Sequence, residues 1–366
     1  MKRCAVRCER FALSAQSSTL TARTEAQSRT GFRLTICDAQ GHAGVGEAAP
    51  FPGYSRETAE QCHASLNALE APLQTLLCAE EVSSFSQWQH VVPQLRLGEH
   101  AASAAFAVET AVIDLCARRG GVSAHRWINP GARTTRIAVN ATLDLRASPA
   151  SLRSQMAAYA QRGFDVFKLK VGHPDWSWRD ERARLELARD VLGDDATLRL
   201  DANGVLSPRD LPHRIEIWRR AGIAFVEEPG PVSQWAPIRD AGISVAADES
   251  LACAAHRSRI VDERLADVLV IKPAMLHGIT GAWALAQRAA ALDMRVVVTH
   301  LFDGPVALAA CRALAFALPQ PPLACGLDTH EGLAGWPPGC GVALGEGPVL
   351  APNESLGLGC CGEPHS

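Results

Sequence analysis

Short apolar runs alternate with amphipathic stretches from about residue 135 onwards. The short runs predict strands at residues 136–143, 164–171, 197–201, 224–228, 243–248, 267–272, 294–300 and, more weakly, 322–326. In the longer stretches the apolar residues recur with helical spacing, most clearly at residues 151–162, 180–192, 208–222 and 281–293. Eight strand–helix units in succession predict a parallel (β/α)8 barrel, with a doubly wound sheet as the alternative.

The first 130 residues follow a different pattern. Strand-like pieces at 31–41 and 44–51 precede a stretch at 101–119 whose apolar residues have helical spacing. This mixture predicts an α+β domain. We therefore divide the chain into an α+β domain of residues 1–130 and a barrel of residues 131–330, and we expect the tail, residues 331–366, to pack back on the first domain.

Composition narrows the class of protein. The 366 residues are 47% hydrophobic and 20% charged, which is typical of a soluble globular protein. The formal net charge of -3 and the lack of a long apolar run give no indication of nucleic-acid or membrane partners. The 12 cysteines have neither C-x-x-C spacing nor the Cys/His spacing of a zinc site. We expect a reduced, cytoplasmic protein that acts on a small molecule, and its oligomeric state stays open.

Charged residues end the predicted strands two to six. Lys168 and Lys170 share one face of the second strand, because side chains alternate along a strand. Asp201, Glu227, Asp248 and Lys272 end the next four strands, at separations of 26, 21 and 24 residues. Catalytic residues of (β/α)8 barrels lie at these carboxyl ends, so we expect the six side chains to meet at one mouth of the barrel.

Each of these residues also has an ordinary explanation. Lysines can protect an exposed edge strand, and an acid after a strand can cap a helix or a turn. Three carboxylates that converge would repel one another unless a cation lay between them. Oxygen ligands of this kind suit Mg²⁺ or Mn²⁺. We therefore predict a metal site formed by Asp201, Glu227 and Asp248.

The motifs at these strand ends resemble those of a known superfamily. K-L-K, R-L-D-A-N-G, F-V-E-E-P, A-A-D-E-S and V-I-K-P-A are similar, in order and spacing, to motifs of the muconate-lactonizing branch of the enolase superfamily. Within that branch, G-E-A-A-P-F-P-G-Y-S-R-E-T at 46–58 and G-L-D-T at 326–329 are most similar to o-succinylbenzoate synthases. The resemblance implies an enolase-like α/β fold, with a modified TIM barrel and an α+β N-terminal capping domain.

The resemblance also implies a reaction. In it, Mg²⁺ stabilises the ene-diolate formed when a proton next to a carboxylate is removed. Lys170 would be the general base, Lys168 would tune Lys170 and hold the substrate carboxylate, and Lys272 would face the other side of the intermediate. The reaction of menaquinone biosynthesis would be loss of water from 2-succinyl-6-hydroxy-2,4-cyclohexadiene-1-carboxylate, giving 2-succinylbenzoate.

Three residues near the predicted ligands have two interpretations each. Arg199 shares the strand face of Asp201, so it either pairs with site carboxylates or bears on the catalytic lysine. Asn203 either orients a ligand carboxylate or makes an Asx-turn. Glu249 either reaches Lys272 or has no role in the site.

Two N-terminal loops resemble the substrate-covering loops of this branch. They are S-R-T-G-F at 28–32 and P-F-P-G-Y-S at 50–55. Arg29 and Phe51 are their candidate substrate contacts, and ordinary turn chemistry is the alternative.

One motif departs from the synthase pattern. The seventh strand of synthases commonly ends in a stretch of the type S-S-x-x-E-S, whereas this chain reads T-H-L-F-D-G at 299–304. Thr299 keeps a hydroxyl and Asp303 keeps a carboxylate, so both stay candidate substrate contacts. His300 is either a substrate contact or a packed imidazole, and we assign no role to His330.

Two other functions stay open. An N-acylamino acid racemase or dipeptide epimerase of the same superfamily would use Lys170 and Lys272 as paired acid and base. The dipeptide branch usually carries D-x-D near the eighth strand, and here only Asp328 is present. The third possibility is a non-catalytic binding protein on a barrel scaffold. In such a protein we would expect the six charged residues to have been replaced, whereas all six positions carry residues that can bind a metal or transfer a proton.

Overall fold

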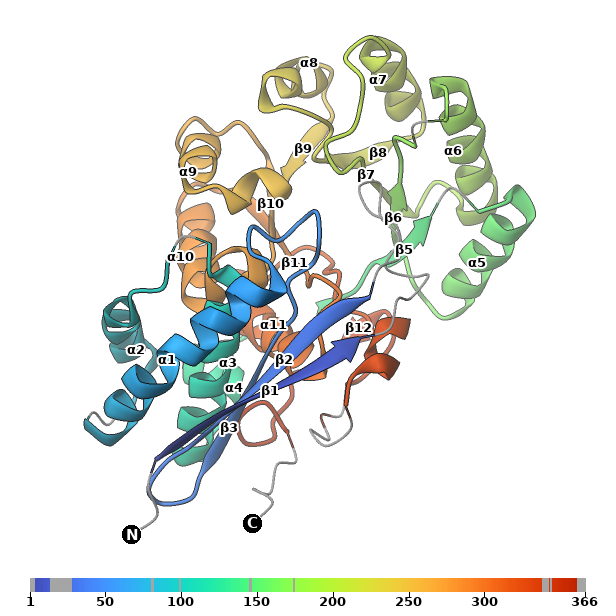
Figure 1. The fold of residues 1–366 in the computed structure, drawn as a ribbon. Helices are drawn as coiled ribbons and strands as arrows, with labels where there is room; N and C mark the ends of the chain where they lie inside the picture. Colours follow the sequence, from blue (N-terminus) through green and yellow to red (C-terminus); the bar gives the residue numbers. More distant parts are fainter. Residues whose placement is uncertain are drawn as a thin grey trace.

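The structure is a computed structural model that describes residues 4–13, 28–79, 82–98, 100–144, 147–173, 175–337, 342 and 344–360. Figure 1 shows an N-terminal layer packed beside a curved sheet that carries helices on its outer face. Parts of the predicted first domain (1–3, 14–27, 80–81, 99) and of the predicted tail (338–341, 343, 361–366) lie outside the described residues. The division at residues 130 and 330 stays a prediction.

The N-terminal layer, as we call residues 4–128, combines an antiparallel sheet with helices. Its strands are β1 (Ala5–Leu13), β2 (Arg29–Cys37) and β3 (Ala43–Ala48), with β2 in the middle. Its helices are α1 (Ala59–Ala79), α2 (Phe85–Val91), η2 (Val92–Leu95), α3 (Ala102–Arg119) and α4 (Ala124–Ile128). The α+β pattern expected for this part of the chain is present.

Close backbone approach joins β3 to α3. A Cβ atom on Gly46 would lie 1.8 Å from the carbonyl oxygen of Ala107, and one on Gly44 would lie 2.1 Å from that of Ala111. Only glycine permits this contact, which explains why the strand G-V-G-E-A carries glycines on its inner face. Helix α3 is consequently buried along most of its length.

The barrel contains seven parallel strands in sequence order. They are β5 (Ala141–Asp144), β6 (Val166–Lys170), β7 (Thr197–Asp201), β8 (Ile223–Glu227), β9 (Ser244–Ala247), β10 (Val268–Ile271) and β11 (Arg295–Val298). The helices of the barrel part are α5 (Pro149–Gln161), α6 (Trp178–Leu192), α7 (Leu211–Arg220), η3 (Val232–Gln234), α8 (Trp235–Asp240), η4 (Glu249–Ala252), α9 (Ala254–Asp262), η5 (Pro273–Met275), α10 (Gly278–Ala291), α11 (Pro305–Ala317) and η6 (Glu331–Gly335). The predicted α/β barrel fold is confirmed.

The ends of the predicted barrel are less regular than the sequence pattern suggested. The first predicted strand, 136–143, divides into β4 (Ile137–Ala138) and β5, and β4 pairs with β12 (Val349–Leu350) instead of joining the sheet. The weak eighth strand, 322–326, forms isolated bridges. It nevertheless closes the circle, because the Leu323 amide donates to Val296 and the Cys325 amide donates to Ala138.

Helix starts in the barrel follow local capping rules. Before α6, the Ser177 hydroxyl accepts a hydrogen bond from the Asp180 amide at 3.4 Å, and the Asp180 carboxylate accepts one from the Ser177 amide at 2.9 Å. This reciprocal pair is a capping box. The helix ends at Gly193, which has a positive φ of 76°.

Two buried glutamates attach the N-terminal layer to the barrel. Glu47 of β3 accepts a hydrogen bond from the Val306 amide in α11 at 2.8 Å. Glu109 of α3 accepts one from the Thr280 amide in α10 at 2.6 Å. Each carboxylate satisfies free amides in the first turn of a barrel helix, which fixes the layer against the barrel mouth.

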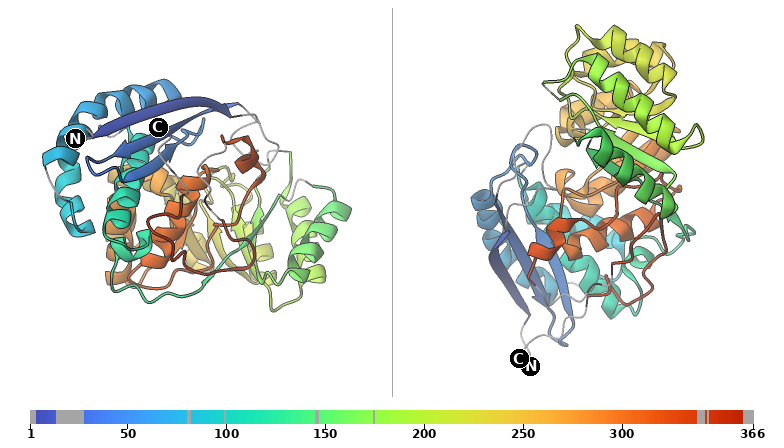
Figure 2. Two further views of the ribbon diagram at one scale, coloured as in Figure 1. Left: turned by 90° about the horizontal axis from the view of Figure 1, so that it is seen from below. Right: turned by 90° about the vertical axis from the view of Figure 1, so that its right-hand side faces the viewer.

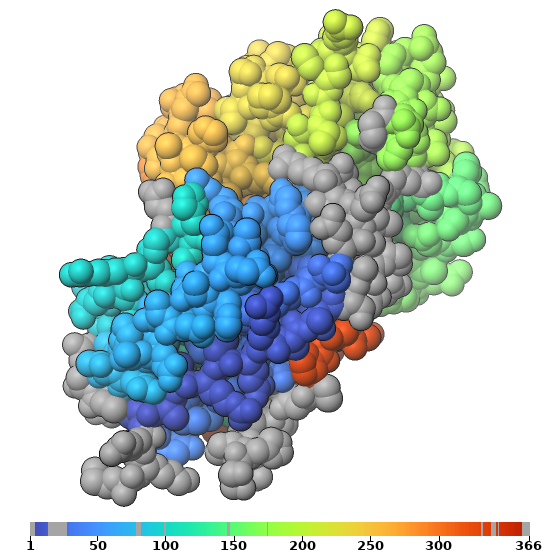
Figure 3. All heavy atoms as spheres, in the orientation of Figure 1, coloured from blue at the N-terminus to red at the C-terminus, as the bar shows by residue number. Residues whose placement is uncertain are grey.

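Residues 344–360 run back across this junction. Gly357 pairs with Ser123, and the Leu358 amide donates to the Asp114 carboxylate of α3 at 2.7 Å. Figure 2 shows the C-terminal segment beside the N-terminal layer, and Figure 3 shows the layer (blue to cyan) beside the barrel helices (green to orange).

In the part of the chain that the structure describes, no helix is long and apolar enough to cross a membrane. No disulfide joins the described cysteines.

Candidate active site

The six charged residues predicted at the strand ends meet at one mouth of the barrel. Strand register aligns Lys170 of β6 with Asp201 of β7, and Asp201 with Glu227 of β8. Asp248 follows β9 and Lys272 follows β10. All three carboxylates are buried.

Lysine ammonium groups pair with all three carboxylates. The Lys168 Nζ lies 2.7 Å from Glu227 Oε1 and 2.8 Å from Asp201 Oδ2. Lys170 also donates to Asp201 Oδ2, and Lys272 donates to Asp248 Oδ2. The six side chains therefore form one buried electrostatic cluster.

The cluster shifts the pKa values of its members in opposite directions. Burial raises the pKa of Asp201, but the charges of Lys168 and Lys170 outweigh burial and hold that pKa well below its usual range. Burial lowers the pKa of Lys168, yet the charges of Asp201 and Glu227 raise it overall. Burial lowers the pKa of Lys272, but the charges of Asp248 and Glu249 raise it overall. Both lysines are therefore held in the charged form.

Asp248 behaves differently from Asp201. Burial raises its pKa strongly, and the charges of Glu249 and Glu227 and a hydrogen bond with Glu227 add to this effect, although Lys272 opposes it. Two carboxylates this close favour either a shared proton or a cation between them.

The donor chemistry of the three acids fits a divalent cation. All of the donors are carboxylate oxygens, which Mg²⁺ and Mn²⁺ prefer. Among the described residues, no group of three or more His, Cys, Asp or Glu side chains is already spaced to hold a metal ion. Each of the three carboxylates is instead engaged by a lysine.

Glu228 supports the loop that carries Asp248. It has a positive φ of 41°, and its carboxylate accepts hydrogen bonds from the amides of Asp248 at 2.9 Å and Ser250 at 3.3 Å. Burial and the charge of Glu249 raise the pKa of Glu228 to about 7. Glu228 thus positions Asp248 without reaching the cavity.

Asn203 and Glu249 form a bridge to Lys170. The Asn203 amide donates to Asp201 Oδ1 at 3.0 Å, which is an Asx-turn. Its side chain accepts from Lys170 Nζ at 3.1 Å and donates to Glu249 Oε1 at 3.0 Å. The Asp201 side chain therefore makes the Asx-turn, with the Asn203 amide as its donor, and the Asn203 side chain joins Lys170 to Glu249. Glu249 makes no hydrogen bond to Lys272 in the described structure.

Arg199 points into the barrel but binds no site carboxylate there. Its guanidinium donates to the Ala324 carbonyl at 2.6 Å and lies over the Phe225 ring, 4.8 Å from its centroid. Burial lowers the pKa of Arg199 to about 10. Of the two interpretations of Arg199, an ion pair with the site carboxylates is not found among the described residues, because the guanidinium donates to the Ala324 carbonyl instead.

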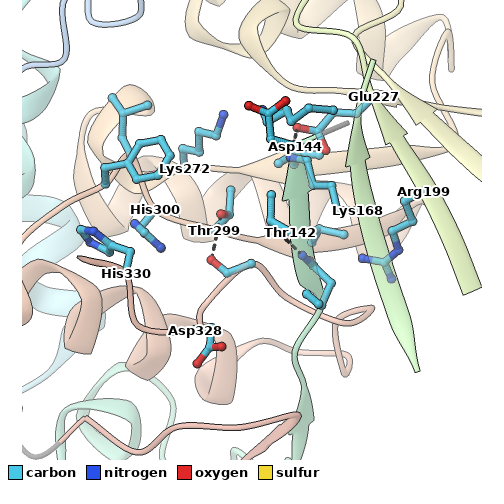
Figure 4. Close-up of a pocket in the computed structure, with 18 of the residues that line it drawn as sticks. Thr142, Asp144, Lys168, Arg199, Glu227, Lys272, Thr299, His300, Asp328 and His330 are labelled. Carbon is cyan, nitrogen blue, oxygen red and sulfur yellow. Dashed lines mark hydrogen bonds and ion pairs between the residues drawn. The ribbon is translucent and has the colours of Figure 1, made fainter. Parts of the chain in front are cut away.

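A cavity of about 450 Å³ opens beside the cluster (Figure 4). The predicted site residues that line it are Lys168, Lys170, Lys272, Glu227, Arg199, Asn203, Phe51 and Thr299. Further lining residues that the sequence analysis did not select are Asn140, Thr142, Asp144, Gln155, Tyr159 and His330. Asp144 ends β5, so the same strand-end rule that selected the other charges could have found it.

The predicted loop contacts divide into lining and supporting residues. Phe51 lines the cavity, and its ring lies under the Arg29 guanidinium at 4.5 Å. Arg29 lies behind this wall, where it donates to the carbonyls of Ala49 and Phe302, the latter at 2.8 Å. Burial lowers the pKa of Arg29 to about 10.

Of the two candidate contacts in the T-H-L-F-D-G loop, one lines the cavity and the other does not. Thr299 lines the cavity and its hydroxyl donates to the Gly326 carbonyl at 2.9 Å. Asp303 does not line the cavity, because its carboxylate turns back to accept the Leu301 amide at 2.8 Å. Burial raises the pKa of Asp303.

Two histidines stack at the cavity wall. The rings of His300 and His330 are nearly parallel, at 18°, with centroids 4.9 Å apart. Burial lowers the pKa of His330 to about 4 and that of His300 well below its usual value, so both rings are neutral near pH 7. His330, to which the sequence analysis assigned no role, therefore lines the cavity.

Comparison with family models agrees with this geometry. Residues 151–359 match the family described as enolase C-terminal domain-like, and residues 3–113 match the MenC N-terminal domain. The chain belongs to the enolase superfamily. The resemblance inferred from the strand-end motifs is thereby confirmed.

Relatives within the superfamily are named o-succinylbenzoate synthases. The protein of Thermosynechococcus vestitus is 30% identical over 341 residues, which cover 87% of this chain and 94% of that protein. The protein of Thermobifida fusca is 34% identical over 195 residues, which cover 52% of this chain and 61% of that protein. The alignments with the Thermobifida protein and with that of Mycobacterium leprae each span about three-fifths of the relative's length, at 61%.

Solved enolase-superfamily structures share the fold. The L-Ala-D/L-Glu epimerase of Bacillus subtilis superimposes with a TM-score of 0.84 at 22% identity, covering 99% of both chains. The muconate lactonizing enzyme of Pseudomonas putida gives a TM-score of 0.73 at 20% identity, covering 91% of this chain and 88% of that chain. At these identities the similarity concerns the fold alone.

Proposed function

We propose that this protein is an o-succinylbenzoate synthase that removes water from 2-succinyl-6-hydroxy-2,4-cyclohexadiene-1-carboxylate to give 2-succinylbenzoate. The observation that carries the proposal is the meeting of Lys168, Lys170 and Lys272 with three carboxylates beside one cavity. The synthase names of the relatives at 30–34% identity support this substrate. On this proposal the enzyme serves menaquinone biosynthesis in the cytoplasm.

The lysine content of the chain supports a proton-transfer role. Only four of its 36 lysine and arginine residues are lysines, and three of the four are Lys168, Lys170 and Lys272. Arginine does not give up its proton in proteins, whereas lysine can act as a base once deprotonated. The chain therefore places three of its four lysines at the site where the proposed proton transfer takes place.

Asp201, Glu227 and Asp248 would hold the divalent metal, Mg²⁺ or Mn²⁺. When bound, the metal would stabilise negative charge that develops on the substrate carboxylate. Formation of the site requires the ammonium groups of Lys168 and Lys272 to yield their carboxylate partners.

Lys170 would act as base and then as acid. Its Nζ takes the proton from C1 of the substrate, and the C–H electron pair moves into the carboxylate to give the ene-diolate. The pair then returns to form the ring double bond as the C6–O bond breaks, and the Lys170 ammonium protonates the departing hydroxide to water. The product is aromatic, so positioning and charge stabilisation are the main tasks of the protein.

The other two lysines would stabilise charge. Lys168 lies between Asp201 and Glu227 and would hold the substrate carboxylate beside the reacting carbon. Lys272 extends from β10, four strands from β6 in the sheet, and would face the opposite side of the ene-diolate.

A racemase or epimerase is the second candidate function. Lys170 of β6 and Lys272 after β10 both line the cavity and come from strands four positions apart in the sheet, so they could exchange a proton on either face of a substrate carbon. Asp144 and Asp328 also line the cavity and could accept the ammonium group of an amino acid or dipeptide. Solved structures with the same fold are named dipeptide epimerase and N-succinyl Arg/Lys racemase, and these names suggest the substrates to test.

An absorbance assay tests the two functions together. Purified protein with Mg²⁺ should consume the diene absorbance of the cyclohexadiene carboxylate, and an EDTA-treated sample should not. In parallel, N-succinylamino acids and dipeptides are incubated in D₂O, and deuterium at the α-carbon is followed by NMR. Exchange without diene consumption would favour the racemase, and inactivity in both assays would refute both enzymatic proposals.

A further inference from the structure

One part of the cavity wall takes no part in the proposed proton transfer. In Figure 4, His300 and His330 lie on the side of the cavity away from Lys168, Glu227 and Arg199. The lysine and carboxylate cluster can bind only the reacting carboxylate of the substrate. The histidine side of the cavity is therefore available to another part of the same molecule.

His300 is a hydrogen-bonding group without a hydrogen-bond partner among the residues that the structure describes. Neither ring nitrogen makes a hydrogen bond among the described residues, and Nδ1 is enclosed. A neutral imidazole carries one N–H donor and one acceptor. Buried polar groups normally have partners, so an unsatisfied imidazole in a cavity wall indicates a ligand group that satisfies it.

His330, unlike His300, is held in place by a hydrogen bond. Its Nε2 lies 2.9 Å from the Asp303 carbonyl oxygen, so Nε2 carries the proton and donates it. The His330 ring then lies flat against His300, with centroids 4.9 Å apart. His330 thus positions the ring of His300, while the donor of His300 stays available.

The charges around His300 favour an anion. Burial has the largest effect in lowering the pKa of His300, and His330 and the cations of Arg312, Lys272 and Arg29 lower it further. The nearest acid of the same loop, Asp303, turns its carboxylate to the Leu301 amide, away from the cavity. Asp328 lines the cavity too, with Arg162 at 3.9 Å from its carboxylate.

We propose that His300, held by His330, binds the second anionic group of the substrate, remote from the reacting carbon. This inference rests on the proposed function, in which that group is the carboxylate of the succinyl arm. His300 occupies the position of the second serine of the S-S-x-x-E-S type of motif. An imidazole N–H donates as a hydroxyl does but extends farther from the backbone, so it selects where the arm ends.

Two ligands that differ only at the end of the arm test this assignment. The first is 2-succinylbenzoate, and the second is 2-butanoylbenzoate, which lacks the terminal carboxylate. Their dissociation constants are measured by calorimetry in the presence of Mg²⁺. Wild-type protein should prefer 2-succinylbenzoate by about 10- to 100-fold, as expected for a hydrogen bond to a charged group.

His300→Leu is the informative variant, since it removes no hydrogen bond within the described structure. The preference should fall to about threefold or less, while the affinity for 2-butanoylbenzoate stays within about threefold of wild type, which also shows that the variant is folded. His330→Asn should reduce the preference less, because it loosens His300 without removing its donor. His256→Leu, on the exposed face of α9, is the matched control and should bind like wild type.

The outcomes separate this inference from the proposed function. If the diene is consumed but His300→Leu keeps the full preference, the histidine subsite is wrong and the synthase stands. If no diene is consumed but the preference is lost in His300→Leu, the subsite stands and the synthase is wrong. Equal affinity of wild type for both ligands, or a uniform loss of both in His300→Leu, overturns the subsite.

Discussion

The Glu47 carboxylate accepts a hydrogen bond from the Val306 amide at 2.8 Å, although 259 residues separate the two positions. The same carboxylate lies 3.0 Å from the Arg33 guanidinium and is fully buried. Burial raises the pKa of Glu47 to about 7, against the opposing effect of Arg33. One side chain thus joins the N-terminal sheet to the helix that follows the 299–304 loop.

Removal of this carboxylate should destabilise the protein strongly. Glu47→Ala leaves Arg33 buried without its partner and frees the amides of α11, so we expect a loss of about 3–5 kcal/mol in the free energy of unfolding. Glu263→Ala, which breaks the exposed pair with Arg259, should cost less than about 1 kcal/mol. Urea unfolding measures both, and similar losses for the two variants would contradict the role of Glu47.

Glu109 should make stability depend on pH. Burial raises the pKa of Glu109 to about 8 from its ordinary 4.5, although amide hydrogen bonds from Thr280 and Ile279 oppose the rise. The folded state therefore binds the proton more tightly than the unfolded chain. The contribution of Glu109 is fully present below pH 4.5 and is lost as pH rises to about 8.

The slope of stability against pH checks this effect. Glu109 alone should contribute a decline of up to about 1.4 kcal/mol per pH unit between those limits. Glu109→Gln should remove that decline while it keeps an acceptor for Thr280. Glu186→Gln, exposed on α6, is the control and should leave the slope of wild type unchanged. Equal slopes for wild type and Glu109→Gln would show that the buried carboxyl is not the source.

Gly46 should not tolerate a side chain. In Gly46→Ala the new Cβ would overlap the Ala107 carbonyl, so β3 and α3 would have to separate. We expect a loss of about 3 kcal/mol or more in stability, at the upper end of overpacking effects. Gly98→Ala is the matched control, since a Cβ there meets nothing within 4 Å. Thermal unfolding of both variants measures the difference, and equal midpoints would argue against the tight contact.

Lys170 should be required for its proton rather than for its charge. Lys170→Ala should lower kcat by about 10²- to 10⁴-fold, the usual contribution of a general base. Lys170→Arg keeps a positive charge but cannot release a proton, so it should be as inactive as Lys170→Ala. The diene assay measures both, with 2-succinylbenzoate binding as the test of an intact site. Substantial activity in Lys170→Arg would exclude Lys170 as the base.

Mg²⁺ should stabilise the folded protein. A ligand at 100 times its dissociation constant adds about 2.7 kcal/mol to stability, so the unfolding midpoint should rise with Mg²⁺ concentration and fall back with EDTA. Asp248→Asn removes one proposed ligand and should abolish most of that rise. Asp194→Asn, in the loop after α6, is the control and should respond like wild type. An equal response of wild type and Asp248→Asn would place Mg²⁺ elsewhere.

Periodicity predicted the regular part of the fold and failed where pairing is irregular. The strands β6 to β11 follow short, mainly apolar runs, which local sequence specifies well. The run at 136–143 looks like one strand, yet its first half pairs with Val349–Leu350. That pairing depends on residues more than 200 positions away, which no local pattern contains.

The sequence predicted the part of the site that depends only on where residues lie along the strands. The strand-end rule identified the lysines and carboxylates because parallel strands bring their ends together. It did not show that Arg29 and Asp303 turn away from the cavity, or that His330 enters it, because rotamers and loop paths decide these directions. Arg199 is a similar case, since its partner is a backbone carbonyl without a sequence signature.

Asp114 links the order of synthesis to the order of folding. Its two carboxylate oxygens accept the amides of Val45, at 3.1 Å, and of Leu358, at 2.7 Å. On the ribosome, the helix that carries Asp114 emerges about 240 residues before Leu358, so this buried acid lacks one of its amide donors until that later segment has been made. Helix α3 therefore reaches its final stability only after a contact of long sequence separation has formed, which should slow folding.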